Sequence, residues 1–211
     1  MIISFDGNVF TGKTTLINKL ALICPCDVIS EHSDFIDSVT EISVFGNNYM
    51  NEQLRYIGVD KLRKQALGRR VCLLDRSFVS MSAHVYALFI VGSADIRNFY
   101  IQELKRCLAN KEIIVPSKYI NLVSPHSIAK QRFDRNQERG TDKAYIDRKY
   151  FTAIEKFNSL WARYVVSMMV DTNDKHFSIE KILDFILTNS IDSNTMGDGR
   201  ILSLTSEIMK I

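Results

Sequence analysis

Residues 7–14 read Gly-Asn-Val-Phe-Thr-Gly-Lys-Thr, between an apolar run at 2–5 and a segment of helical periodicity that begins at Leu16. A glycine, four further residues and then Gly-Lys-Thr, between a strand and a helix, is typical of a loop whose backbone N–H groups surround phosphate at a helix N-terminus. The alternative is a surface turn beside a lysine, which this context disfavours. The sequence therefore predicts a nucleotide-binding loop made of Gly7, Asn8, Val9, Phe10, Thr11, Gly12, Lys13, Thr14 and Thr15.

Four side chains, two in this loop and two after the apolar run 71–74, are candidates for binding phosphate and magnesium. In such a loop the ammonium of Lys13 reaches the β- and γ-phosphates, and the hydroxyl of Thr14 binds Mg²⁺. Asp75 directly follows the apolar run 71–74, so it is predicted to join Thr14 as a magnesium ligand where the strands end. Arg76 offers a guanidinium suited to phosphate oxygens. The alternative is that Asp75 caps the following helix and pairs with Arg76.

The rest of the chain alternates between apolar runs and helical patterns. That alternation favours an α/β fold, a doubly wound five-stranded parallel sheet with helices on both faces. The predicted strands are Ile2–Phe5, Val28–Ser30, Val71–Leu74, Tyr119–Val123 and Val165–Val170. The predicted helices cover residues 13–23, 50–67, 78–91, 95–109, 126–138, 147–163 and 178–189.

Composition narrows the class of protein. The chain has 211 residues, 46% of them hydrophobic and 24% charged, with a net charge of +3. This charge is too small to predict binding to a nucleic-acid polymer or a membrane surface. The chain begins with its first strand rather than a signal peptide, and no apolar stretch is long enough to span a membrane. Its four cysteines lack paired zinc spacing, which favours reduced thiols and a cytoplasmic location.

We expect one main domain over residues 1–190. Residues 192–200 are rich in Gly, Ser, Asn and Asp, so 191–211 are predicted to be a linker and a short C-terminal appendage.

Glu31 is the candidate general base. It follows the second predicted strand, so its carboxylate should reach the same edge as the phosphate loop and accept a proton from an attacking hydroxyl. His32 is the neighbouring alternative for this role. A solvent-exposed acid that opens a loop is the structural alternative.

An arginine-bearing lid is predicted at about residues 132–146. Arg132, Arg135 and Arg139 follow the fourth strand, and the last two are four residues apart on one helix face. Such a lid closes on the transferred phosphoryl group and offsets its developing charge. The alternative is a solvated helix face, with Asp134 and Glu138 as partners.

Together these residues resemble the P-loop deoxynucleoside kinases, with the thymidylate kinases as close relatives. Residues 5–15 are similar to the family's I-E-G-N-I-G-x-G-K-S-T, and residues 75–77 to its E-R-S. Residues 135–139 resemble its R-x-x-x-R lid, and residues 150–161 its helix Y-L-x-x-L-x-x-L-H-x-x-W. The sequence departs from the family at Phe10, where the family has a loop glycine, and at His32, where a proline is usual.

The resemblance implies a P-loop nucleoside kinase fold that transfers the γ-phosphoryl group of ATP, with Mg²⁺, to the 5′-hydroxyl of a deoxynucleoside. It implies catalytic roles for Glu31, Lys13, Arg76, Arg135 and Arg139. Arg76, Glu31 and a base-reading glutamine, Gln53, would bind the acceptor. A homodimer through helices 78–91 and 95–109 is a further expectation, and the alternative is that these helices cover the sheet.

Two other functions remain open at this point. A thymidylate-type kinase phosphorylates a monophosphate and needs an extra cation, which Arg55, Lys61 or Arg63 would supply. A nucleotide-binding switch or decayed kinase is the second alternative, and Phe10 is the departure that favours it.

Overall fold

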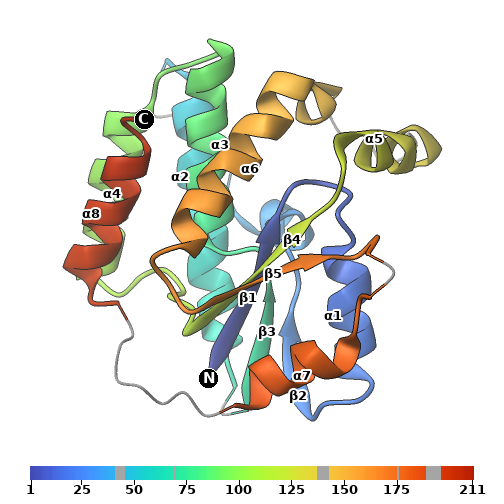
Figure 1. The fold of residues 1–211 in the computed structure, drawn as a ribbon. Helices are drawn as coiled ribbons and strands as arrows, with labels where there is room; N and C mark the ends of the chain where they lie inside the picture. Colours follow the sequence, from blue (N-terminus) through green and yellow to red (C-terminus); the bar gives the residue numbers. More distant parts are fainter. Residues whose placement is uncertain (41–45, 69, 137–142, 175, 189–195) are drawn as a thin grey trace.

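The computed structural model describes residues 1–211 except 41–45, 69, 137–142, 175 and 189–195. Five parallel strands form one sheet in the order β2-β3-β1-β4-β5 (Figure 1). Each predicted strand is present, with ends that differ by at most two residues from those expected. The strands are β1 (Ile2–Gly7), β2 (Cys26–Ile29), β3 (Val71–Asp75), β4 (Lys118–Val123) and β5 (Ser167–Asp171).

Helices cover both faces of this sheet, as the doubly wound fold requires. On one face, α1 (Lys13–Ala21) and α7 (Ile179–Leu187) pack their apolar sides on alternate residues of β1, such as Ile3 and Phe5. On the other face lie α3 (Phe78–Val91) and α6 (Arg148–Ala162), with the fully buried Phe157 between them and the sheet. Burying these apolar side chains is the main force that holds the layers together.

A further layer of helices covers α3 and α6 on their outer side. It contains α4 (Arg97–Ala109) and α8 (Asp198–Ile208). Helix α2 (Asn48–Gln65) instead lies beside the end of β3, where the side chain of Arg63 bonds the carbonyl oxygen of Asp75. Helix α8 comes from the predicted C-terminal appendage, and it packs against α4 and α6 with Ile201, Leu204 and Ile208 in the largest core cluster. Among the described residues, no helix is long and apolar enough to cross a membrane.

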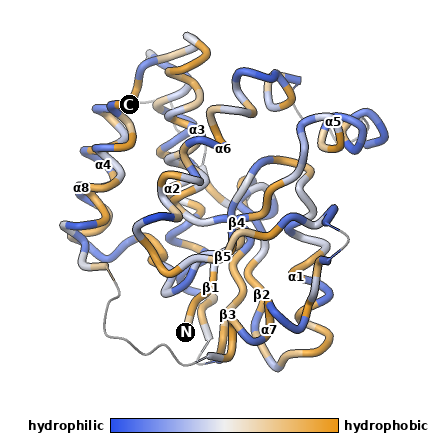
Figure 2. The backbone as a smooth tube through the Cα atoms, viewed as in Figure 1, coloured by the Kyte–Doolittle hydropathy of each residue, from blue (hydrophilic) through white to orange (hydrophobic). Residues whose placement is uncertain are grey.

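The remaining described elements are short and lie near the carboxyl ends of the strands. They are η1 (His32–Ser38), α5 (His126–Arg135) and η3 (Lys143–Ile146). The strands carry mostly apolar residues, whereas α5 is largely hydrophilic (Figure 2). Helix α5 therefore stands at the surface, beside the sheet edge where the phosphate loop lies (Figure 1).

The sheet topology fixes where a ligand binds. Strand β1 lies between β3 and β4, and the chain leaves β1 for α1 on one face of the sheet but leaves the neighbouring β3 for α3 on the other face. In open α/β sheets, ligands bind outside the carboxyl end of such a strand. Gly7 ends β1 with φ 129°, and a Cβ there would lie 2.2 Å from the carbonyl oxygen of Leu122. The first glycine of the loop is therefore required by the close approach of β4.

Candidate functional site

A cleft of about 1230 Å³ opens at the carboxyl edge of the sheet. It is lined by the phosphate loop together with residues from the end of β2, from α2, from the end of β3 and from α3, α5 and α6. Residues far apart in the sequence meet here, among them Lys13, Glu31, Gln53, Arg76, Arg132 and Tyr150.

The phosphate loop wraps around its own lysine. The Nζ of Lys13 donates to the carbonyl oxygens of Asn8 at 2.5 Å and Gly7 at 3.4 Å. Burial and then the charge of Arg76 lower the pKa of Lys13 to about 7. Gly12, at φ 92°, precedes the first turn of α1, whose N–H groups point toward the cleft mouth as an anion site requires. A bound phosphate would give the ammonium an anionic partner in place of carbonyl groups.

The bulky Phe10 is accommodated by its neighbours in α5. Its backbone adopts φ 58°, and its ring meets that of Phe133 edge-on at a centroid distance of 5.6 Å. The guanidinium of Arg132 donates to the carbonyl oxygen of Phe10 at 2.9 Å and to the side chain of Asn173 at 2.8 Å. The loop is thus fastened to the helix that begins the predicted lid.

A second fastening joins the loop to α6. The side-chain amide of Asn8 donates to the carbonyl oxygen of Phe151 at 3.0 Å, across 143 residues of sequence. Asn8 is buried, so this hydrogen bond forms away from competing water.

The residues predicted to bind magnesium are adjacent. The hydroxyl of Thr14 donates to Oδ2 of Asp75 at 2.6 Å. The other carboxylate oxygen, Oδ1, is buried and has no hydrogen-bond partner among the described residues. Hydroxyl and carboxylate oxygens are the ligands that Mg²⁺ prefers, so these two side chains fit the ion. Ser77, rather than Asp75, caps α3, since its hydroxyl accepts from the N–H of Val79 at 3.2 Å.

Glu31 and Arg76 form an ion pair in the cleft. The Nε of Arg76 donates to the Glu31 carboxylate at 2.9 Å, and the hydroxyl of Ser33 donates to the same carboxylate at 2.8 Å. Burial raises the pKa of Glu31, but the Arg76 guanidinium outweighs it and holds this pKa at about 2. Glu31 is therefore ionised and held in place at neutral pH. His32 is turned into the protein, where its Nε2 lies 2.9 Å from the guanidinium of Arg63.

Asp6 is a site-building residue for which the sequence analysis found no role. Its carboxylate accepts from the N–H of Ser77 at 3.0 Å, from the Ser77 hydroxyl at 2.9 Å and from the Ser80 hydroxyl at 2.6 Å. These bonds attach the start of α3 to the end of β1. The sequence does contain a signal for this role. Asp6 is an acid near the end of the buried strand β1, and Ser77 and Ser80 follow β3, the neighbouring strand in the sheet.

Gln53 has the features of a base-reading residue. Its side chain is fully buried and lines the cleft, and neither amide atom has a hydrogen-bond partner among the described residues. Burying an amide without partners costs free energy, which a ligand with a matching donor and acceptor would recover. The observation supports a ligand that presents such an edge.

The rings of His84, Tyr145 and Tyr150 also line the cleft. The sequence did not predict that they would. The Nδ1 of His84 hydrogen-bonds the hydroxyl of Tyr150, and Tyr145 packs edge-on against Tyr150 at 5.5 Å. Burial lowers the pKa of His84 to about 4, so the ring is neutral. Tyr150 belongs to the apolar stripe of α6, and its periodicity alone indicated core packing.

The predicted lid is described in part. Arg135 is exposed at the end of α5 and is absent from the cleft lining, while Arg139 lies outside the described residues. Lys130 and Asp134 pair at 3.1 Å on the surface of α5. Arg132 is the arginine of α5 whose side chain contacts the phosphate loop in the described part of the chain. The roles of Arg135 and Arg139 stay predictions.

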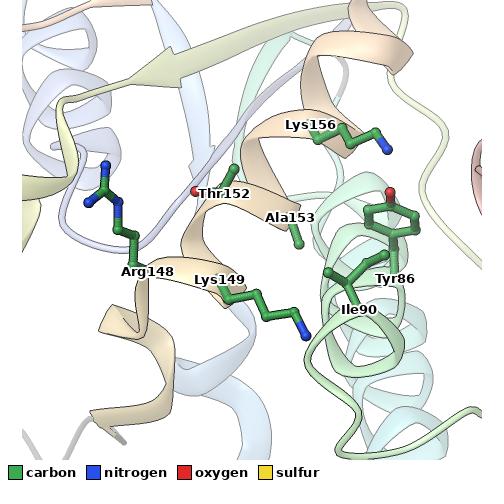
Figure 3. Close-up of a pocket in the computed structure, with 7 residues that line it drawn as sticks. All are labelled: Tyr86, Ile90, Arg148, Lys149, Thr152, Ala153 and Lys156. Atoms are coloured by element: carbon green, nitrogen blue, oxygen red, sulfur yellow. The ribbon is translucent and has the colours of Figure 1, made fainter.

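A second pocket, of about 430 Å³, lies between α3 and α6 (Figure 3). It is lined by Tyr86, Ile90, Arg148, Lys149, Thr152, Ala153 and Lys156. This lining contains no carboxylate, histidine or cysteine. The groups that suit phosphate transfer are therefore those of the larger cleft.

Comparisons with known proteins agree with this architecture. No protein-family model matches the chain, and no curated protein sequence matches it significantly. Solved structures do match it. One is a deoxyadenosine kinase from M. mycoides with the products dCMP and a flexible dCDP bound, at 15% identity and a TM-score of 0.61, covering 88% of this chain and 96% of that one.

Two more structures of the same kinase match equally well. The one with bound dATP has 16% identity and a TM-score of 0.62, and covers 87% of this chain and 98% of that one. The one with bound dCTP has the same identity and TM-score, and covers 87% and 97%. At this level of identity the likeness concerns the fold. The chain therefore has the P-loop fold of the deoxynucleoside kinases.

Proposed function

We propose that this protein transfers the γ-phosphoryl group of ATP to the 5′-hydroxyl of a deoxynucleoside, with Mg²⁺. The observation that carries the proposal is that one cleft contains the phosphate loop, an ionised Glu31 and a buried Gln53 amide without partners. The nucleotides bound to the M. mycoides kinase, whose fold this chain shares, support a nucleotide ligand.

Each residue has a role in this proposal. Lys13, Arg76 and, after lid closure, Arg135 and Arg139 offset phosphate charge, which is the main task in phosphoryl transfer. Glu31 accepts the hydroxyl proton, and Gln53 hydrogen-bonds the base. Thr14 and Asp75 would hold Mg²⁺, which neutralises charge on the β- and γ-phosphates when it is bound. A cytoplasmic location and a homodimer also stay predictions. Leu104 of α4, one of the two helices expected to form the dimer, is buried within this chain.

A nucleoside fits the cleft better than a monophosphate. The cations that sequence analysis offered for an acceptor phosphate are engaged elsewhere. Arg63 is fully buried, Lys61 pairs with Glu112 at 3.0 Å, and Arg55 donates to the carbonyl oxygen of Ile36 at 2.9 Å. Glu31 would in addition repel an acceptor phosphate, whereas a neutral hydroxyl needs a proton acceptor.

The deciding experiment measures kcat/KM with ATP and Mg²⁺ for thymidine, deoxycytidine and deoxyadenosine against their 5′-monophosphates. We expect a nucleoside to be the best acceptor. A clear preference for any monophosphate would overturn the proposal in favour of a thymidylate-type kinase. Transfer to neither class would favour a nucleotide-binding switch or decayed kinase.

The magnesium assignment predicts the behaviour of Asp75→Asn. The amide keeps the size of the side chain but removes the charge that attracts the ion. We expect the Mg²⁺ concentration for half-maximal activity to rise about 10–100-fold, the scale seen when groups that support a metal site are changed. Thr14→Ser keeps the hydroxyl and serves as the control, with a Mg²⁺ requirement close to that of the wild type. An unchanged requirement in Asp75→Asn would leave Asp75 as a structural partner of Thr14.

A further inference from the structure

Arg63 is a fully buried cation that contacts the end of strand β3 without lining the cleft. It lies on α2, and its Nη2 donates to two successive backbone carbonyls, those of Asp75 at 2.7 Å and Arg76 at 2.9 Å. Successive carbonyls of an extended strand point in opposite directions, so they reach one nitrogen only where the chain turns sharply. Arg63 therefore holds the turn that ends β3.

The backbone of this turn is strained, and the strained conformation directs the side chain of Arg76 toward Glu31. Arg76 adopts φ 66°, a left-handed conformation that costs a residue with a Cβ free energy. In this conformation the side chain of Arg76 reaches both Glu31, at 2.9 Å, and the carbonyl oxygen of Gly7, at 3.2 Å. A strained backbone persists only where its surroundings hold it, and the two bonds from Arg63 are such a restraint.

The same guanidinium also touches the segment that carries Glu31. Its Nη1 lies 2.9 Å from Nε2 of His32, the residue next to Glu31. Burial lowers the pKa of His32, so the ring is neutral and Nε2 accepts this hydrogen bond, since arginine can only donate. One fork thus contacts the backbone of Arg76 and the neighbour of Glu31, the two sides of the ion pair.

Asp60 orients this fork. Its Oδ1 accepts from Nη1 of Arg63 at 3.0 Å, and its Oδ2 accepts from the N–H of Ile114 at 2.9 Å. Asp60 is fully buried, and it lies one helical turn before Arg63 on the same helix. A buried charge stays in place when it is paired and hydrogen-bonded. Both oxygens of Asp60 and both terminal nitrogens of Arg63 meet this condition, whereas the Arg63 Nε has no partner among the described residues.

We infer that Arg63, braced by Asp60, is a positioning residue that sets Glu31 and Arg76 at their working separation. It touches neither ligand nor reacting atoms, and acts through the turn at Arg76 and through His32. This inference rests on the proposed function, because it assigns the pair a working geometry. It predicts that changing Arg63 alters the chemical step and the acidity of Glu31 together.

The first test is Arg63→Lys, which keeps the charge but lacks the planar fork that reaches both carbonyls and Asp60. We expect kcat to fall about 10–100-fold, with the KM for ATP changed less than about threefold, the size of effect that misplaced groups distant from the chemistry produce. Val59→Ala is the matched control, because Val59 is fully buried on the same helix and lies outside the cleft lining. It should lower the melting temperature and leave kcat within about threefold.

The second readout does not depend on activity. Glu31 faces the cations Arg76 and Lys13, together with the hydroxyl of Ser33, and Arg76 holds its pKa at about 2. When Arg76 moves away, burial is opposed only by the weaker effects of Ser33 and Lys13, and the pKa of Glu31 rises. In ¹³C NMR spectra of the glutamate-labelled protein, we expect the Glu31 carboxyl to titrate at a clearly higher pH in Arg63→Lys than in the wild type or in Val59→Ala. Glu31→Gln assigns the signal.

The outcomes separate the two claims. If Arg63→Lys does not fold, Asp60→Asn tests the same brace, and it should raise the Glu31 pKa in the same direction. Wild-type kcat and an unshifted Glu31 signal in the folded variant would overturn the inference, as would an equal loss of kcat in Val59→Ala. If the wild type transfers no phosphoryl group, the proposed function fails, whereas the Glu31 titration still decides whether Arg63 positions the pair.

Discussion

Lys13→Ala is expected to lower kcat about 10³-fold, which corresponds to about 4 kcal/mol of lost transition-state stabilisation. The ammonium is held by carbonyl oxygens of the phosphate loop, so it is in place before phosphate arrives. Such a preorganised charge loses no reorganisation energy during the reaction. The measurement is steady-state turnover of the best acceptor with saturating ATP. Lys105→Ala, an exposed lysine of α4, is the control, and it should keep wild-type turnover.

The same lysine predicts a pH effect on ATP binding. With its pKa lowered to about 7, the free lysine is largely deprotonated at pH 8 and protonated at pH 6. Phosphate favours the charged form, so ATP binding at pH 8 should take up a proton, and binding at pH 6 should take up little. Calorimetry in two buffers of different ionisation enthalpy measures this uptake. Wild-type turnover in Lys13→Ala, or equal uptake in that variant, would refute the role of the loop.

Glu31→Gln is expected to lower kcat roughly 10²–10⁴-fold with little change in ATP affinity. The substitution preserves shape and can still accept a hydrogen bond from Arg76, but it removes the ability to take the hydroxyl proton. The low pKa of Glu31 makes it a weak base that is always ionised at neutral pH, so we expect no loss of activity from its protonation above pH 4. Turnover and ATP binding are measured separately, over pH 5 to 8.

Asp37→Asn is the matched control for this change. Asp37 lies in η1, the short helix that begins directly after Glu31. It is fully exposed and pairs with Arg55 at 3.7 Å, so its amide variant should turn over within about threefold of the wild type. An unaffected Glu31→Gln beside a strong loss in His32→Ala would transfer the role of base to His32. The structure makes that outcome unexpected, because a nitrogen of His32 already lies against Arg63.

The fold could be predicted from the sequence because its signals are local. Each strand is a short apolar run bounded by polar residues, and the loop at 7–14 has a spacing that is typical of a phosphate loop between a strand and a helix. Residues placed directly after strands, Glu31 and Asp75 among them, could be assigned to one edge because parallel strands end together. The exact start of β2, at Cys26, could not, since Cys26 and Asp27 interrupt the apolar pattern.

The inner side of the site could not be predicted in this way. Arg63 was expected to be a cation available to an acceptor phosphate, because helical periodicity does not reveal that two carbonyl groups and an aspartate would bury it. Tyr150 looked like a core residue and His84 had no predicted role, because the cleft they line forms only when α3 and α6 pack. These roles depend on which elements meet, and that information is distributed over the whole chain.

The pairing of β1 between β3 and β4 also sets the order in which the molecule is completed during synthesis. The loop is among the first segments to leave the ribosome, yet the partner of Asn8, the carbonyl of Phe151, is made 143 residues later. At about 5–20 residues per second, the nascent loop waits roughly 7–30 seconds for that contact. Strand β1 likewise gains its two neighbours only when β3 and then β4 have been made, so the first segment to be translated depends on residues more than a hundred positions later for its surroundings.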